Sequence, residues 1–564
     1  MTTLSVLAER SLPLDLSDAW IEQRKRWREL DGTARLWSRD ASLFTGADED
    51  RWLGWLDLPE RPFEPSYERI ASAVLQAGIQ RVVLLGMGGS SLGAEALVAN
   101  LAREDHRPRF TVLDTTEPLA VTAALDRSAA QPTFVIAASK SGGTLETELL
   151  LRTFAERVPP ARLAVITDPG SKLEQWARDG GSDWILYGDP EVGGRFSVLS
   201  PFGLCAPAAL GLSLEEVSRG ARRAASACRE QSASNPGVEL GTLMAAAAAT
   251  GRMLLTVLTS TPATAAFADW LEQLVAESLG KRGRGLLPIV GETITGEHDQ
   301  VLDQREARLV VACEPGAPAT SALEAAGVAV VSIDLEDPQE VGFELFRCQL
   351  ATAVAGALLG IHPFDQPDVE SAKRATRAWI ERAEQGGELA AGIRSGASEG
   401  VTAFVFDGGE ANRSASAGQA LDRLLSSAQD ALFCALLAFL PAVPAARAAL
   451  ERLRAAIAAR CRLATSVGIG PRYLHSTGQF HKGGADRGVF VVFSRAVGAI
   501  PPAVAGSIPG HRATFAEVHA AQALGDFEAL AERGRRVLLL ELTGDVPATL
   551  DRLAAEISGC RSLS

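Results

Sequence analysis

The feature of this sequence that most constrains its fold is an alternation of short apolar runs with longer amphipathic runs, which begins near residue 61. "RVVLLG", "RFTVLD", "TFVIAAS" and "LAVITD" have the length and composition of buried strands. Segments with helical spacing lie between and after them, such as "LGAEALVANLA" and "TLETELLLRTFAER". Strands that alternate with helices form parallel sheets covered on both faces. The sequence therefore predicts an α/β fold.

Composition divides the chain into further parts. Residues 1–60 carry five tryptophans among many charges, which indicates amphipathic helices that lean on a neighbouring surface. An Ala-rich stretch over 214–280 is expected to be helical, and "GLLPIVG", "ARLVVACE" and "GVAVVSIDL" then predict further strands. "EQGGELAAGIRSGASEG" is typical of a linker. We expect the N-terminal helical segment to be followed by α/β domains over 61–225 and 226–390, and by an α/β extension over 400–564.

Charge and composition exclude several classes of function. Of the 564 residues, 47% are hydrophobic and 22% are charged, as in an ordinary globular protein. The net charge of −14 argues against a nucleic-acid partner, because phosphate backbones require a basic surface. The most apolar stretches are too short to span a bilayer, and the N-terminus lacks a signal-peptide pattern. Seven cysteines without a CxxC spacing predict free thiols, so we expect a cytoplasmic protein that does not contact membranes.

A glycine-rich turn follows the first predicted strand, in "LLGMGGSSLG" over residues 84–93. Such a turn before a helix can present backbone N–H groups to an anion. A dinucleotide fingerprint fits poorly, because its third glycine position is Ser91. We therefore take Gly89 and Ser90 as candidate contacts for a polar ligand, with a tight turn that binds nothing as the alternative.

A second polar turn, "AASKSGGTLET", joins a strand to the first turn of a helix at residues 137–147. Unpaired N–H groups and the helix dipole favour an anion at this position. One hydroxyl would be an ordinary N-cap, but four are more than capping requires. The sequence predicts a phosphate-binding loop here, made by the residues Ser139, Lys140, Ser141, Thr144 and Thr147.

Two further segments, "GGRFSVLS" and "FDQPDVESAK", resemble the signature segments of glucose-6-phosphate isomerases, whose phosphate-binding loops belong to the sugar-isomerase (SIS) fold. The resemblance covers roughly residues 60–375 directly. The remainder, which includes "YLHSTGQFHKGG", is similar to the isomerase half of bifunctional transaldolase/glucose-6-phosphate isomerases. The resemblance implies two SIS-type three-layer αβα units with parallel sheets, followed by the C-terminal α/β extension.

The implied reaction moves a proton between C2 and C1 of a sugar phosphate through a cis-enediolate. It requires a base near both carbons and a cation or donors near the enediolate oxygens. Arg195 matches the family arginine beside the enediolate. Glu277 in "LVAESLGKRGRG" and Glu292 in "LPIVGETITG" both match a family segment that carries the base. We favour Glu277 because its flanking residues match better on both sides, and a surface glutamate at a helix end is the alternative for either.

The resemblance also assigns residues to ring opening and to substrate contact. Lys373 occupies the position of the lysine that points into the active site in this family, and Gln366 that of a substrate-contacting glutamine. Asp368 is a departure, since Gly or Ala is usual there, and an extra carboxylate changes the surroundings of the lysine. An ordinary solvated helix lysine is the alternative for Lys373.

The family opens the sugar ring with a histidine, often from the partner subunit. His475 in "LHSTGQFHKGG" is the favoured candidate, although it follows the lysine segment where the family histidine precedes it. His298 is the second candidate, but it lacks the Ser-x-Gly-Gln pattern. Lys482 and His481 are expected either to contact the substrate phosphate or to line a turn.

No metal-ligand spacing and no Walker loop occur in the sequence, so we expect neither a metal nor another cofactor. The resemblance implies a glucose 6-phosphate/fructose 6-phosphate isomerase of glycolysis and gluconeogenesis, acting as a homodimer. A dual glucose/mannose phosphate isomerase and a non-catalytic phosphosugar-binding regulator are the alternatives. A separately encoded transaldolase partner is also compatible with the resemblance.

Overall fold

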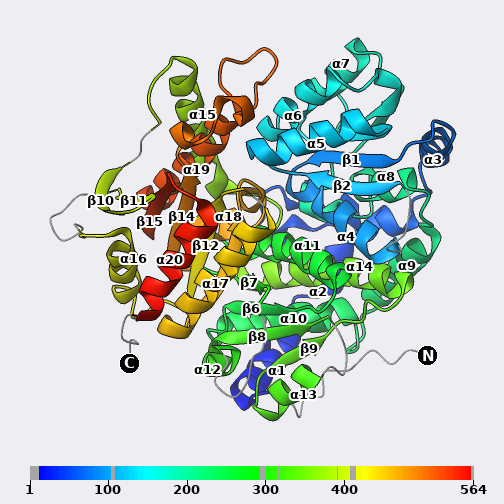
Figure 1. Cartoon of the computed structure of the whole chain (residues 1–564). Helices are drawn as coiled ribbons and strands as arrows, with labels where there is room; N and C mark the ends of the chain where they lie inside the picture. Colours follow the sequence, from blue (N-terminus) through cyan, green and yellow to red (C-terminus); the bar gives the residue numbers. More distant parts are fainter. Residues whose placement is uncertain are drawn as a thin grey trace. The chain divides into compact units, whose positions relative to one another are not determined.

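The computed structural model describes residues 12–102, 108–292, 300–313, 318–389, 392–406, 414–441 and 443–559. The chain forms two compact units, each described here by itself. Unit 1 comprises Met1–Asp114, Asp126–Thr293 and Arg305–Gln366, and unit 2 comprises Thr115–Leu125, Ile294–Gln304 and Pro367–Ser564. In Figure 1 the ribbon runs from blue to green through most of unit 1, and from yellow-green to red through most of unit 2.

The first sheet of unit 1 has five parallel strands in the order β2-β1-β3-β4-β5. The strands are β1 (Arg81–Gly86), β2 (Arg109–Leu113), β3 (Thr133–Ala138), β4 (Leu163–Thr167) and β5 (Trp184–Tyr187). The helices that alternate with them in the sequence are α3 (Ser66–Gln76), α4 (Leu92–Leu101), α5 (Pro118–Ala130), α6 (Leu145–Ala155) and α7 (Lys172–Asp179). The four strands predicted for this region are confirmed, and so is their parallel arrangement.

The second sheet of unit 1 has four parallel strands in the order β7-β6-β8-β9. The strands are β6 (Leu254–Leu258), β7 (Leu287–Val290), β8 (Arg308–Ala312) and β9 (Val330–Ser332). The prediction that residues 214–280 are helical throughout is wrong at β6, which lies between β7 and β8 inside the sheet. Periodicity over a run of five residues, four of them apolar, does not separate a buried strand from a helix, because the run is too short.

Helices of unit 1 enclose one hydrophobic core that contains buried residues from Leu12 to Phe364. They include α8 (Pro201–Ala209), α9 (Glu215–Arg229), α10 (Pro236–Ala249), α11 (Pro262–Leu279), α13 (Pro318–Ala325) and α14 (Pro338–Leu359). The expected domain boundary at residues 225 and 226 lies within α9. Helix α9, which spans this boundary, packs against α14. Both sheets belong to the same compact unit.

The contact of α9 with α14 depends on two glycines. A Cβ atom at Gly220 would lie 1.8 Å from the carbonyl oxygen of Gln339, and one at Gly342 would lie 2.0 Å from that of Val217. Any larger residue would force the two helices apart. By length and composition α14 could cross a membrane, but its apolar window is 100% buried in the fold, as in the core helix of a globular domain.

The tryptophan-rich N-terminal segment packs onto unit 1, as its amphipathic pattern predicts. It contains α1 (Leu14–Glu29) and α2 (Gly32–Trp37), followed by short 3₁₀ turns up to Glu60. The Trp20 indole donates to Thr242 Oγ1 at 3.0 Å. Trp55 is fully buried, and its ring centroid lies 5.1 Å from that of Phe196 and 5.6 Å from that of Phe346. The segment thus reaches the residue next to Arg195.

Unit 2 has a six-stranded sheet in the order β10-β11-β15-β14-β12-β13. The strands are β10 (Ile393–Ser398), β11 (Val401–Val405), β12 (Phe433–Phe439), β13 (Ala464–Ile469), β14 (Gly488–Arg495) and β15 (Arg536–Leu542). The last four are mutually parallel, while β10 and β11 form an antiparallel hairpin on β15. The segment expected to be a linker therefore contains β10. Its last glycine, Gly400, lies in the turn between β10 and β11.

Helices α15 (Glu370–Glu384), α16 (Ala417–Ser426), α17 (Pro444–Cys461), α18 (Gly478–Gly483), α19 (Phe515–Glu532) and α20 (Val546–Gly559) complete unit 2 with the short α12 (Gln300–Asp303). A separate hydrophobic core lies between the sheet, α16, α17 and α20. Six cysteines of the described part of the chain are unpaired, and five of them are buried. Burial therefore accounts for their apolar surroundings in the sequence.

Candidate active site

The glycine-rich turn after β1 lies against the loop that carries Arg195. Gly88 has a φ of +53°, and a Cβ atom at Gly89 would lie 2.2 Å from the backbone of Gly194 and 2.7 Å from the nitrogen of Arg195. The hydroxyl of Ser197 donates to the carbonyl oxygen of Gly89 at 3.3 Å. Glycine at position 89 is therefore required for the two loops to approach each other.

The predicted phosphate-binding loop lies between β3 and α6 and has most of its side chains engaged. Ser139 Oγ and Thr144 Oγ1 are 2.9 Å apart. The Lys140 ammonium binds Asp168 Oδ2 at 2.5 Å and the carbonyl oxygen of Asp189 at 2.9 Å. Burial raises the pKa of the Asp168 carboxyl, while the hydrogen bond from Lys140 opposes that rise. The charge of Lys140 is thus balanced within the protein.

Two hydroxyls of this loop are placed differently. Ser141 accepts the N–H of Gly143 at 3.3 Å, on the exposed side of the loop. Thr147 lies in the first turn of α6, is 1% exposed, and its Oγ1 has no hydrogen-bond partner. A buried hydroxyl without a partner costs free energy unless a ligand or water satisfies it. Thr147 is therefore the hydroxyl here that most clearly lacks a partner.

Arg195 and Glu277 meet in the interior of unit 1. Arg195 lies in the 3₁₀ turn Gly194–Phe196 and is 5% exposed, and Glu277 lies near the end of α11 and is 6% exposed. Arg195 Nη1 is 3.4 Å from Glu277 Oε1, a loose ion pair. Glu277 Oε2 accepts from Gln273 Nε2, one helical turn earlier, at 3.0 Å. Burial lowers the pKa of the Arg195 guanidinium, and the charges of Glu277 and Asp365 oppose this.

The tighter bonds of Arg195 go to neutral acceptors. Its Nε donates to Ser278 Oγ at 2.8 Å. Its Nη2 donates to the carbonyl oxygens of Pro363 at 2.6 Å and of Asp365 at 2.8 Å. Neutral acceptors fix the direction of the guanidinium without neutralising it. The arrangement therefore leaves a buried positive charge beside a carboxylate that it does not clamp.

Lys281 joins this group, although no sequence motif indicated it. It is 3% exposed and donates to the carbonyl oxygens of His362 at 2.6 Å and of Asp365 at 2.7 Å, and to Asp365 Oδ1 at 2.7 Å. Burial, and next the charge of Arg195, lower the pKa of the Lys281 ammonium to about 7. The available signal was its position four residues after Glu277, which places it close beyond the end of the same helix.

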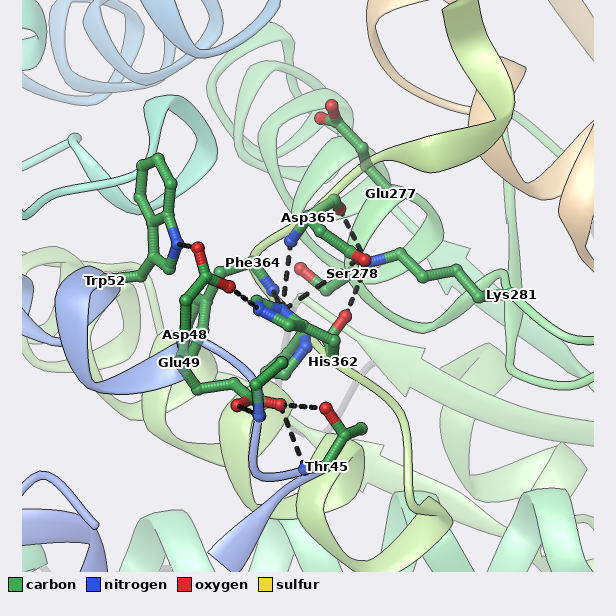
Figure 2. Close-up of polar contacts among 12 residues, drawn as sticks. Thr45, Asp48, Glu49, Trp52, Glu277, Ser278, Lys281, His362, Phe364 and Asp365 are labelled. Atoms are coloured by element: carbon green, nitrogen blue, oxygen red, sulfur yellow. Dashed lines mark hydrogen bonds and ion pairs between the residues drawn. The ribbon is translucent and has the colours of Figure 1, made fainter. Parts of the chain in front are cut away.

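Figure 2 shows how these side chains meet at the turn formed by residues 362–365. His362 Nε2 lies 2.9 Å from Asp48 Oδ1, and His362 Nδ1 accepts the N–H groups of Phe364 at 3.1 Å and Asp365 at 3.2 Å. Glu277, Ser278 and Lys281 approach the same turn from α11 and the residues after it. The "HPFD" stretch thus supplies backbone acceptors to both buried cations.

The residues predicted for ring opening lie elsewhere in the chain. Lys373 is in α15 of unit 2, where it binds Glu370 at 2.7 Å and leaves 43% of its side chain exposed. His475 is half-buried at the end of the 3₁₀ turn Arg472–His475, also in unit 2. Gln366 is exposed at the last position of unit 1. The assignments of these three residues stay predictions.

Asp368, the departure from the family pattern, has a structural partner within unit 2. Its Oδ2 accepts from Gln479 Nε2 at 2.7 Å, its N–H donates to Gln479 Oε1 at 3.1 Å, and Arg533 binds its Oδ1 at 2.7 Å. The structure thereby joins the "FDQPDVESAK" and "YLHSTGQFHKGG" segments. The extra carboxylate holds the histidine motif, while the ammonium of Lys373 binds Glu370.

The remaining sequence candidates are distributed as follows. Glu292 is enclosed by Arg308, at 2.5 Å, and His298 lies outside the described residues. Lys482 is buried in an ion pair with Asp526. His481 is 1% exposed, neither of its ring nitrogens has a partner, and burial holds its pKa well below the ordinary value. In the part of the chain that the structure describes, no cluster of three or more His, Cys, Asp or Glu residues could hold a metal ion.

Comparisons with known proteins identify the family of this chain. The profile of the Phosphoglucose isomerase family matches residues 70–285. The glucose-6-phosphate isomerase of Rubrobacter xylanophilus is 32% identical over 390 residues, which cover 58% of this chain and 89% of that protein. A hypothetical protein from Thermus thermophilus has a similar structure, with a TM-score of 0.55 and 26% identity over 64% of this chain and 97% of that one.

A second solved structure has a similar fold at lower identity. The glucose-6-phosphate isomerase of Chlamydia trachomatis gives a TM-score of 0.53 and 16% identity, and the likeness covers 65% of this chain and 86% of that one. The sequence identity to the Rubrobacter enzyme extends over nearly all of that relative. This chain therefore belongs to the glucose-6-phosphate isomerase family.

Proposed function

We propose that the protein interconverts glucose 6-phosphate and fructose 6-phosphate by moving a proton between C2 and C1 through a cis-enediolate. The observation that carries this proposal is the buried pair of Arg195 and Glu277, 3.4 Å apart. Glu277 takes the proton from one carbon and returns it to the other, and Arg195 stabilises the charge that develops on the enediolate oxygens. Family membership supports both roles.

The phosphate end of the substrate is assigned to the loop over residues 139–147. The N-terminus of α6 and the unpartnered hydroxyl of Thr147 support this assignment. Ser139, Ser141 and Thr144 supply further hydroxyls, and Gly89 and Ser90 supply the neighbouring turn. An anchor far from the reacting carbons provides binding energy that positions the sugar for proton transfer.

Ring opening is assigned to Lys373 and His475, and substrate contact to Gln366. The family resemblance of their two segments supports these roles, as does the hydrogen bonding of Asp368 to Gln479, which links the segments. We further propose a cytoplasmic homodimer. Sedimentation of the purified chain tests the dimer, and it would contradict that assignment by showing a monomer at micromolar concentration.

The function is tested by NMR of glucose 6-phosphate in deuterated water, with neither metal nor nucleotide added. We expect fructose 6-phosphate to form and deuterium to enter C2 of the recovered glucose 6-phosphate, because the base exchanges its proton with solvent. A parallel sample with mannose 6-phosphate separates a dual glucose/mannose isomerase from a glucose-specific one. Sugar phosphate that binds without turnover would overturn the proposal and identify a regulatory module instead.

A further inference from the structure

The turn at residues 362–365, here called the carbonyl turn, holds two buried cations by its backbone. Lys281 Nζ binds the carbonyl oxygens of His362 and Asp365, and Arg195 Nη2 binds those of Pro363 and Asp365. The charge of Arg195 helps to lower the pKa of Lys281, which shows that the two cations repel each other. The conformation of the carbonyl turn therefore decides where each of them sits.

A single side chain fixes that conformation. His362 Nδ1 accepts the N–H groups of Phe364 and Asp365, at 3.1 and 3.2 Å, so the imidazole closes the turn on itself. Because Nδ1 is the acceptor, the ring proton is placed on Nε2, which faces Asp48 Oδ1 at 2.9 Å. The hydrogen bond from His362 holds the pKa of the Asp48 carboxyl below its ordinary value. The histidine therefore links the turn to the N-terminal segment.

The N-terminal side of this link is itself organised. Asp48 also accepts the Trp52 indole N–H at 3.3 Å. Glu49 is fully buried and accepts the backbone N–H groups of Thr45 and Ala47, at 2.9 and 2.8 Å. Figure 2 shows Trp52, Asp48, Glu49 and Thr45 grouped on one side of His362, with Lys281 and Glu277 on the other. The loop that presents Asp48 is therefore held in place before it meets the histidine.

We propose that His362 is a positioning residue, held by Asp48, that shapes the carbonyl turn and so sets the Arg195 guanidinium beside Glu277. The N-terminal segment thereby takes part in building the active site. This inference rests on the proposed isomerase function for its effect on turnover. Its structural part, the support of Lys281 and Arg195 by the turn, stands independently.

The expected effect falls on kcat. Loss of the Nδ1 acceptor leaves two N–H groups of the turn unsatisfied, and the turn relaxes. A displacement of about 1 Å at a charge that stabilises the transition state costs about 10²-fold in rate. The partners of His362 belong to the carbonyl turn and the N-terminal segment, and the phosphate-binding loop is built apart from them, so KM is expected to change little. We expect His362→Ala to lower kcat about 10- to 100-fold.

Replacement of His362 by asparagine distinguishes a positioning role from an effect of side-chain volume. Asn Oδ1 can accept the same two N–H groups, as in an Asx turn. His362→Asn should therefore recover most of the kcat that His362→Ala loses. Asp48→Ala removes only the second partner of the imidazole, and a loss of about 2- to 5-fold is expected, as for one partly exposed hydrogen bond.

The experiment measures kcat and KM of the full-length wild type and of His362→Ala, His362→Asn and Asp48→Ala. The matched control is His511→Ala, which removes another histidine–carboxylate contact, to Glu384, in unit 2. In the same samples, brief acetylation followed by peptide mass spectrometry reports Lys281. Its labelling should rise at least about fivefold in His362→Ala as the turn opens, while that of the equally buried Lys482 stays constant.

The outcomes separate this inference from the function on which it rests. If the wild type is inactive but the labelling of Lys281 still rises in His362→Ala, the isomerase proposal is wrong and the structural role of His362 in the carbonyl turn stands. An active wild type whose kcat is unchanged in His362→Ala, or is equally low in His362→Asn and His362→Ala, would overturn the positioning role. If His362→Ala does not fold, Asp48→Ala decides: a kcat and a Lys281 labelling equal to those of the wild type would overturn the positioning role.

Discussion

Two buried arginine–glutamate pairs in unit 1 consist of the same residue types but differ in their geometry. Arg308 binds Glu292 at 2.5 Å through Nη1 and at 3.3 Å through Nη2, and neither side chain is more than 5% exposed. Arg195 stands 3.4 Å from Glu277 and makes its shorter bonds with a hydroxyl and two carbonyl oxygens. The first pair is bidentate and suits a structural role. The second keeps its carboxylate available, as a proton-transferring base requires.

The largest expected effect separates the two glutamates by activity. Glu277→Gln should lower kcat by about 10²- to 10⁴-fold, since an amide cannot accept a proton, with little change in melting temperature. Glu292→Gln should retain its activity per folded molecule. Steady-state kinetics with circular dichroism on both variants measures this. Loss of turnover confined to Glu292→Gln would keep the family assignment and reverse our choice of base.

The second effect separates the same residues by stability. Glu292→Gln leaves the Arg308 guanidinium buried without its charged partner and should lower the free energy of unfolding by about 3 kcal/mol. Glu277→Gln should cost less than about 1 kcal/mol, because its pair is loose. Urea unfolding of unit 1, followed by tryptophan fluorescence, provides the measurement. Equal stability losses would mean that the two pairs do not differ in the way their geometry indicates.

The third prediction concerns Lys281, the second cation beside Glu277. Its pKa of about 7 in the fold lies below 10.5 in the unfolded chain, so between these values the unfolded chain binds more protons. The contribution of Lys281 to the free energy of unfolding therefore increases as the pH rises from about 7 toward 10.5. Lys281→Met removes it. Urea titrations should show that the free energy of unfolding rises more between about pH 6 and pH 9 in the wild type than in Lys281→Met. An equal change in both proteins would contradict this prediction.

The smallest expected effect concerns the hydrogen bond that orients Glu277. Gln273 donates to Glu277 Oε2 at 3.0 Å, and Gln273→Leu removes the donor at nearly constant volume. A loss of about 3- to 10-fold in kcat is expected, equivalent to one hydrogen bond to a charged group. The matched control is Gln175→Leu, whose side chain binds the exposed Asp179 at 2.7 Å. Identical kinetics for the two variants would show that Glu277 needs no support from its own helix.

The sequence predicted the α/β class, the strands of the first sheet and the loops that follow them. It missed β6, because a run of five residues between two helical patterns carries too little periodicity to identify a strand. It predicted a linker where β10 pairs with β11, because glycine and serine also occur in hairpin turns. Motif similarity selected Arg195 and Glu277, which lie far apart in the sequence and which the fold brings together. Lys281, His362 and Asp48 carry no motif signal of this kind.

What the sequence determined by itself is local: hydrophobic periodicity predicted most of the elements, and glycine–hydroxyl turns predicted an anion as the ligand of the loops. Only the tertiary structure shows how the surroundings of Glu277 and Glu292 differ: Arg308 binds Glu292 closely, while Glu277 lies beside a guanidinium that other acceptors hold. It also shows that the "HPFD" turn provides backbone carbonyl oxygens to two cations. The physical reason is that ion pairs and hydrogen bonds to backbone carbonyl oxygens depend on distances between residues far apart in the chain. Only the folded structure sets those distances.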